Sequence, residues 1–351
     1  PMAAGAMLAA ILMAGSTVSP AGAPATWEFE GRQLRASTEG GRLLWTHAFG
    51  RVVSRPTTAR VVGGVRVDID NDGVDEAVVP VRFSAPRARP LETDAVFAFR
   101  ANGSEIWSVQ PAVTLRWGDE VFSGPWHVYD IATGMTPSGP RTWIAYSHHT
   151  WWPAFVVEVN PDGEQFLRYV QPGRIFTITY WPTTSGHLLV AGGTLNEASS
   201  ASLALVNLDG PPARWSGKTA PPSCSGCPAY DPAGMFLLPT SDVTKALHRP
   251  YGWVMRSRVL NSGVELVTNA GFGWGSIVTL SQDLQVTSFA RADQYWQVHQ
   301  ELESEGRISH PAAECPDVRQ PLEVQRWVPT AGWSTLSVPL RVALPTADAA
   351  P

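Results

Sequence analysis

One hairpin pattern recurs along the 351 residues of the chain. An apolar strand-like segment leads into a turn rich in Gly, Asn or Asp, and a second segment follows that carries an aromatic or large apolar residue. Six segments show it: Gln33–Trp45, Ala95–Trp107, Phe155–Phe166, Leu203–Trp215, Ile277–Phe289 and Val324–Trp333. A chain that repeats one two-stranded unit in this way is expected to fold as an all-β protein.

The spacing of the hairpins favours a β-propeller. Successive turns lie about 47 to 74 residues apart, which overlaps and exceeds the period of a four-stranded blade. Further strand-like segments, such as His127–Ala132 and Thr142–Ser147, precede the hairpins. We expect six four-stranded blades, with seven as the alternative because 221–258 and 295–319 are long, and the C-terminal strand from Trp333 would complete the first blade. Two β-sandwiches would also contain hairpins, but would not repeat one signature six times.

Composition agrees with a globular β-protein and limits its partners. Charged residues make up 16% of the chain, hydrophobic residues 44%, and there are 31 Gly and 30 Pro, which favours short strands and turns over long helices. A short helix is expected only near Gln300–Glu305. The net charge is −5 without a long basic run, so nucleic acid is not an expected partner.

An acidic loop at 68–76 is the strongest local motif. Its sequence, DIDNDGVDE, alternates carboxylates and contains a turn glycine, Gly73, between two strand-like flanks. Ca²⁺ prefers a flexible cage of carboxylate, carbonyl and water oxygens. The expected ligands are the side chains of Asp68, Asp70, Asp72 and Glu76 and the carbonyl of Val74.

Two other interpretations of the loop fit its sequence less well. An EF-hand would need an acidic residue at the twelfth position, which is Val79, and a helix on each side. A solvated turn would also be rich in Asp and Asn, but would not require acids at alternate positions. Calcium bound in a loop between two strands is therefore the preferred interpretation.

The loop resembles the Asp-x-Asp-x-Asp-Gly-x-x-Asp repeat of extracellular FG-GAP or VCBS propellers, which are related to the head of the integrin α-chain. Glu76 stands where that family has its last Asp, and only one hairpin unit carries the loop. The segments ending at Trp45 and Trp107 are also similar to the Gly-x-x-x-Trp endings of PQQ-type propeller repeats. The resemblance implies a fold and a calcium ion, and leaves the function open.

Both termini differ in composition from the central part. Residues 1–25 are apolar and rich in small residues, which is typical of a signal peptide or of the end of a membrane anchor. Either interpretation places the rest of the chain outside the cytoplasm, in the periplasm or secreted. We expect 26–344 to form a single propeller domain and 345–351 to be a disordered tail.

Three cysteines fit an oxidising compartment. Cys224 and Cys227 form a C-x-x-C motif with Pro-rich flanks, and Cys315 lies far downstream. A structural disulfide is expected, either between Cys224 and Cys227 or between Cys315 and one of that pair. A zinc site would need more ligands than the motif supplies.

A histidine- and tryptophan-rich segment offers candidates for chemistry. In a strand, His148 and His149 would point to opposite faces and could not readily share a metal. Either could serve as a general base. An axial catalytic site would use His127, His149 and His187, with Arg174 holding an anion, as in propeller enzymes of the arylsulfotransferase type. Tryptophans of the segment could stack on a ligand: Trp126, Trp151 and Trp152.

Taken together, the sequence predicts a monomeric, extracytoplasmic binding or sensing module that contains structural calcium. Its partner would be a protein or a glycan. The alternative is a periplasmic propeller enzyme, a sulfotransferase or hydrolase, that uses axial histidines.

Overall fold

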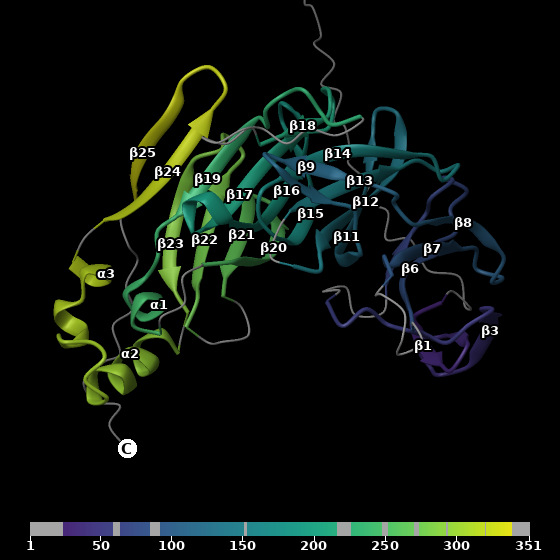
Figure 1. Ribbon diagram of the computed structural model, residues 1–351, viewed down its shortest axis with the longest axis horizontal. Helices are drawn as coiled ribbons and strands as arrows, with labels where there is room; N and C mark the ends of the chain where they lie inside the picture. Colours follow the sequence, from purple (N-terminus) through teal and green to yellow (C-terminus); the bar gives the residue numbers. More distant parts are fainter. Residues whose placement is uncertain are drawn as a thin grey trace, which may run out of the picture.

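The computed structural model describes residues 24–58, 64–84, 92–150, 153–215, 226–247, 252–269, 274–292, 294–319 and 321–338. Strands predominate, which confirms the all-β class. Figure 1 shows the sheets following one another in chain order along an open arc, with β1 and β3 near one end and α1 and α2 near the other. The predicted signal segment 1–25 lies outside the described residues except for its last two, and the predicted tail 345–351 lies outside them entirely.

Three of the sheets contain a four-stranded antiparallel meander, in which each strand pairs with the next one in the chain. The first consists of β5 (Val65–Val67), β6 (Glu76–Phe83), β7 (Ala95–Phe99) and β8 (Glu105–Val109), with β4 (Val53–Ser54) also on β6. The second consists of β11 (Trp126–Thr136), β12 (Gly139–His148), β13 (Ala154–Val159) and β14 (Gln165–Gln171). The third consists of β20 (Val254–Leu260), β21 (Gly263–Thr268), β22 (Ser276–Ser281) and β23 (Val286–Arg291).

The remaining strands form one larger sheet and several small units. A six-stranded sheet has the order β15 (Ile175–Thr183), β16 (Gly186–Leu195), β17 (Ser200–Asn207), β19 (Gly234–Leu238), β24 (Leu322–Val328) and β25 (Gly332–Val338). A three-stranded sheet contains β1 (Thr26–Glu30), β2 (Gln33–Ser37) and β3 (Leu43–Ala48). The short strands β9 (Leu115–Trp117) and β10 (Glu120–Phe122) pair with each other, and β18 (Ala213–Arg214) lies on the edge of β14.

Five of the six predicted hairpins are present, and Leu203–Trp215 is not one of them. There β17 ends at Asn207, and β18 pairs in parallel with β14 of the preceding sheet. Pro211 and Pro212 lie just before β18. Proline has no N–H to donate to a ladder, so this segment cannot pair back directly along β17.

The C-terminal hairpin also differs from the prediction, because β24 pairs with β19 and does not complete the first blade, which would contain Gln33–Trp45. Trp327 and Trp333 of this hairpin pack edge-on against Trp215, with ring centroids 5.0 and 5.7 Å apart. The hairpin is therefore part of the six-stranded sheet, and its tryptophans pack against Trp215. A closed ring is not seen in the part of the chain that the structure describes (Figure 1).

Successive sheets pack face to face, with a separate apolar core between each pair. In β12, alternate side chains point to opposite faces. Ile144 and Tyr146 belong to the core shared with the preceding sheet, while Trp143 and Ala145 belong to the core shared with the following one. The sheet of β11–β14 is thus buried on both faces, which explains why its strands are apolar at consecutive positions.

The aromatic residue and the turn glycine of the hairpin signature meet between sheets. A Cβ atom added at Gly103 would lie 2.6 Å from Trp45 of the preceding hairpin, and one added at Gly163 would lie 2.6 Å from Trp107. Both glycines have positive φ, +87° and +84°, which side chains other than glycine rarely adopt. Each turn glycine thus leaves room for the tryptophan of the hairpin before it.

The helices gather beside the C-terminal half of the sheets (Figure 1). They are α1 (Asp242–Ala246), α2 (Tyr295–Ser304) and α3 (Pro316–Arg319), with the 3₁₀ turn η2 (Ala312–Glu314) between α2 and α3. A second 3₁₀ turn, η1 (Asn196–Ala198), connects β16 to β17. The expected helix near Gln300–Glu305 is confirmed, since α2 covers most of it. Residues of α1, α2 and the segment around η2 share a small core of their own, which includes Val243, Tyr295 and Cys315. Among the described residues, no helix has the length and apolar character needed to cross a bilayer.

Candidate metal centres and binding groove

The acidic loop joins β5 to β6, as the sequence predicts. Asp68, Asp70 and Glu76 bring one carboxylate oxygen each to within 4.8 Å of one another. Asp68 accepts hydrogen bonds from the backbone N–H groups of Asp72 and Gly73, at 3.0 and 2.9 Å, which curl the loop around its carboxylate. Three of the predicted side-chain ligands therefore converge.

The other two predicted ligands are not part of that cluster. The Asp72 carboxylate accepts a hydrogen bond from the Val74 N–H at 2.8 Å, as in an Asx turn. A role for Asp72 or for the carbonyl of Val74 as a ligand stays a prediction. Arg100 pairs with Asp70 at 2.8 Å and shares in balancing the negative charge of the loop.

Glu76 is the buried member of the loop, with 2% of its surface exposed. Burial raises its pKa from 4.5 to about 7, and the negative charges of the three aspartates add to this, although the Ile69 N–H donates to its carboxylate at 2.8 Å. An ionised Glu76 thus needs a positive partner. Carboxylates that converge on a buried glutamate form the donor set that Ca²⁺ accepts.

The predicted histidines do not form one site. His127 is the second residue of β11 and pairs across the sheet with Ser147. Ser147 lies next to the beginning of β15, since the Ile175 N–H donates to its hydroxyl. His187 lies at the other end of that strand, opposite Pro182 in the register. Seven residues of extended chain separate the two ends by about 23 Å. The expected axial arrangement of His127, His149 and His187 is therefore wrong.

Each of the two distant histidines has a local partner. His127 Nδ1 lies 3.4 Å from an oxygen of Asp94, a fully buried carboxylate that also pairs with Arg82 at 2.7 Å. Burial opposes ionisation of Asp94, but hydrogen bonds from Arg82 and His127 hold its pKa below the usual value. His187 pairs with Asp209 at 2.8 Å and stacks on Tyr180.

His148 and His149 lie close together, contrary to the prediction that they face opposite sides. Strand β12 ends at His148, so the alternation of side chains stops there, and the two ring centroids are 4.2 Å apart. His148 contacts the Thr150 hydroxyl at 2.7 Å through Nδ1, and burial lowers its pKa. Arg174, which directly precedes β15, lies close to this end of β12, because its guanidinium donates to the carbonyl of Thr150 at 2.9 Å.

The predicted ligand-stacking tryptophans have different settings. Trp126 is fully buried, donates its indole N–H to the carbonyl of Val113 at 2.9 Å, and packs edge-on against Phe155. It is a core residue and cannot stack on a ligand, which corrects the prediction. Trp151 and Trp152 lie outside the described residues.

Cys315 is a buried free thiol, which excludes the predicted disulfide between Cys315 and the C-x-x-C pair. Cys224 lies outside the described residues, so the disulfide between Cys224 and Cys227 stays a prediction. Burial raises the pKa of the Cys315 thiol to about 11.

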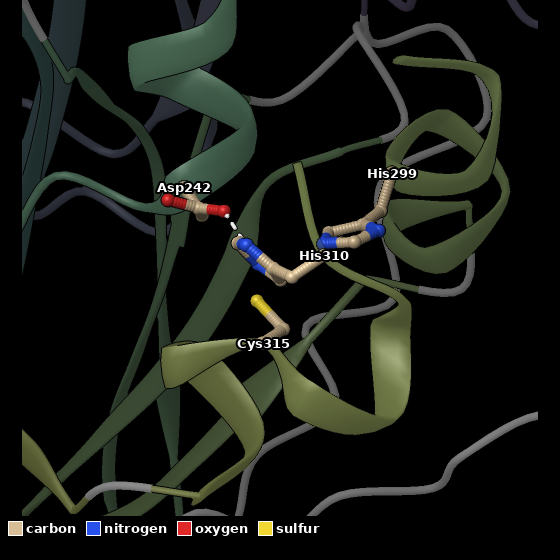
Figure 2. Close-up of side chains that lie close together, drawn as sticks. All are labelled: Asp242, His299, His310 and Cys315. Atoms are coloured by element: carbon tan, nitrogen blue, oxygen red, sulfur yellow. Dashed lines mark ion pairs between the residues drawn. The ribbon is translucent and has the colours of Figure 1, made fainter. Parts of the chain in front are cut away.

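The structure also assembles a second group of metal-type ligands that the sequence analysis missed. Asp242 opens α1, His299 lies on α2, His310 follows α2, and Cys315 lies between η2 and α3. One ligand atom from each of the four lies within 4.8 Å of all the others. Figure 2 shows the four side chains turned towards one another, with the ion pair between His310 and Asp242 marked. The signal in the sequence was the run of His299, His310 and Cys315 within one segment.

An open groove is present in the part of the chain that the structure describes. Its volume is 870 Å³, and it lies between the β9–β10 hairpin and the edge formed by β13 and β14. Two of its apolar residues are exposed: Val121 by 52% and Phe166 by 50%. The lining consists of Pro111, Ala112, Val113, Thr114, Arg116, Val121, Val157, Gln165, Phe166, Leu167, Pro212 and Gly226.

Comparisons with known proteins do not identify a family. No family model matches the chain, and no curated protein matches it. Among solved structures, a protein of unknown function from Bacteroides caccae has 12% identity, a TM-score of 0.27, and coverage of 79% of this chain and 97% of that one. Hydrazine synthase from Kuenenia stuttgartiensis has 12% identity, a TM-score of 0.33, and coverage of 93% and 69%. These values establish neither a fold nor a function.

Proposed function

We propose that this chain is an extracytoplasmic, calcium-stabilised β-protein that binds an apolar segment of a protein partner. The observation that carries the proposal is the open groove of 870 Å³ beside β9–β10 and β13–β14. Exposed apolar side chains that line a concave surface are typical of protein interaction sites.

The chemistry of the groove favours a protein over a glycan. Val121, Phe166 and Leu167 supply apolar surface, and half of the surface of Phe166 is exposed. Arg116 lies in the same lining, and its guanidinium would donate hydrogen bonds to a carboxylate or carbonyl oxygen of the partner. An aromatic residue with an arginine nearby is the composition that dominates binding energy at protein interfaces.

The acidic loop supports the calcium part of the proposal. Asp68, Asp70 and Glu76 already converge, and Glu76 is buried among negative charges. A bound Ca²⁺ would satisfy these carboxylates and hold β5 against β6. The same reasoning favours an FG-GAP-like role for the loop, in which the ion stabilises a turn and does not take part in a reaction.

The stacking of the sheets supports propeller-type blades. Consecutive sheets share cores, and the Trp45–Gly103 and Trp107–Gly163 contacts repeat from one sheet to the next. We propose that the meanders are blades of a propeller-like stack, and the six-bladed ring stays a prediction. The extracytoplasmic location and the monomeric state rest on the sequence alone. The alternative of an axial-histidine enzyme loses support, because His187 lies about 23 Å along β15 from the other histidines.

Selection of binders from a displayed random peptide library tests the groove. Peptides selected on the wild-type chain should share apolar residues, and Phe166→Asp should weaken their binding at least tenfold. Met135→Asp is the matched control, because Met135 is 49% exposed on another strand, β11. Peptides that bind the two variants equally would refute the groove as the binding site.

Thermal unfolding tests the calcium part separately. Ca²⁺ at millimolar concentration should raise the Tm and EDTA should lower it, because an ion that binds only the folded state stabilises that state. Asp70→Ala should remove most of the response. An unchanged Tm from micromolar to millimolar Ca²⁺ would contradict the proposal.

A further inference from the structure

The four-residue cluster at the helices combines donors that suit one class of metal ion. It offers a thiol, two imidazoles and a carboxylate, from Cys315, His299, His310 and Asp242. Thiolate and imidazole ligands favour zinc and other borderline or soft ions over Ca²⁺ and Mg²⁺, which take oxygen ligands. The cluster is therefore chemically distinct from the acidic loop at 68–76.

The geometry is close to that of a tetrahedral site. All four ligand atoms lie within 4.8 Å of one another. Bonds of about 2.0 to 2.3 Å in a tetrahedron place neighbouring ligand atoms about 3.3 to 3.8 Å apart. A contraction of about 1 Å through side-chain rotation would complete the sphere.

The burial of His299 gives independent evidence for a ligand. Its side chain is fully buried, and neither Nδ1 nor Nε2 has a hydrogen-bond partner among the described residues. Buried polar groups are normally paired, and each unmade bond is costly. Its neighbour in the cluster, His310, lies 5.4 Å away between ring centroids (Figure 2). A metal ion held between them would satisfy one nitrogen of His299.

Groups around the cluster are arranged as supports of a metal site. The backbone N–H of Asp317 donates to the sulfur of Cys315. The Asp317 carboxylate accepts hydrogen bonds from the backbone N–H of Asp242, at 2.9 Å, and from the hydroxyl of Tyr295, and pairs with Arg291 at 2.9 Å. Outer groups of this kind orient the ligands of known zinc sites.

We infer that Asp242, His299, His310 and Cys315 form a structural Zn²⁺ site that joins α1, α2 and the η2–α3 segment. All four positions would come from the protein, as in structural zinc sites, and two of the ligands are fully buried. The ion would fasten a small helical unit whose own core is limited to a few side chains, which include Val243, Tyr295 and Leu302.

Metal analysis and X-ray absorption on the full chain, produced without a histidine tag, test the site without any substitution. The chain should hold one Zn²⁺ after dialysis against metal-free buffer. The zinc edge spectrum should fit one sulfur at about 2.3 Å and three nitrogen or oxygen ligands at about 2.0 to 2.2 Å. No retained zinc, or a sphere with two sulfurs or none, would overturn the assignment; two sulfurs would point to the C-x-x-C pair.

Variants then assign the ligands. His299→Asn and Cys315→Ser should each lower Zn²⁺ affinity at least tenfold in competition with a chelating dye. His149→Asn, an exposed histidine outside the cluster, and Asp70→Asn in the acidic loop are the controls and should keep wild-type affinity. Wild-type affinity in both ligand variants would overturn the proposal, while loss of zinc binding in Asp70→Asn would move the site to the loop.

Discussion

Replacing Glu76 with Gln should stabilise the metal-free chain at pH 8. Glu76 is 2% exposed and faces three aspartates, so its pKa in the folded chain is about 7 against 4.5. Ionising such a group costs the folded state about 3 kcal/mol relative to the unfolded chain. Gln keeps the shape and can still accept the hydrogen bond from Ile69. It is itself desolvated, so we expect a net gain of about 2 kcal/mol.

The sign of the pH dependence follows from the direction of the shift. Because the folded-state pKa is raised, wild type in EDTA should be most stable below about pH 4.5 with respect to this group. That contribution is lost as the pH rises through about 7. Glu76→Gln should lack this loss, and it should also respond less to Ca²⁺, because one of the three converging carboxylates is gone.

Urea unfolding followed by tryptophan fluorescence, at pH 5 and pH 8 in EDTA, measures the effect. Glu105→Gln is the control, because Glu105 is an exposed glutamate on β8 of the same sheet. The reasoning would be refuted if Glu76→Gln were less stable than wild type at pH 8 in EDTA. The reasoning would also be refuted if wild type and Glu76→Gln lost the same stability between pH 5 and pH 8.

Three further predictions concern packing and burial. Gly103→Ala should destabilise the fold by more than about 1 kcal/mol, because its Cβ would meet the tryptophan of the preceding hairpin; Gly41→Ala, with positive φ but open space, should cost less in the same unfolding assay. Arg82→Met should cost about 3 kcal/mol by removing the arginine that pairs with the buried carboxylate of Asp94, whereas Arg35→Met, which breaks an exposed pair, should cost under about 1 kcal/mol. The buried Cys315 should resist alkylation in the folded chain and react once urea unfolds it, as mass spectrometry would show. Equal losses of stability in Gly103→Ala and Gly41→Ala, or in Arg82→Met and Arg35→Met, would contradict the first two predictions. Rapid alkylation of the folded chain would contradict the third.

Local patterns in the sequence predicted local structure well. The turn glycines and strand residues of Gln33–Trp45 and Ala95–Trp107 lie within one hairpin each, so their pairing could be derived from the pattern alone. The acidic loop is also contiguous, and the convergence of Asp68, Asp70 and Glu76 needs only a turn between β5 and β6.

Non-local contacts could not be derived in the same way. The pairing of β24 with β19 depends on packing against Trp215, far along the chain. The histidines looked similar in sequence, but the strand register separates His127 from His187. From the sequence, Cys315 was predicted to form a disulfide. Its proximity to Asp242 depends on how α1 packs against α2, which the sequence pattern does not show.

Hydrogen–deuterium exchange of the chain with a selected peptide tests the central claim most directly, because it locates the binding surface without substitutions. We expect slower exchange in 111–122 and in 157–167, the segments that contribute most of the groove lining. Protection confined to other segments, such as the His148–His149 end of β12, would contradict a binding role for the groove.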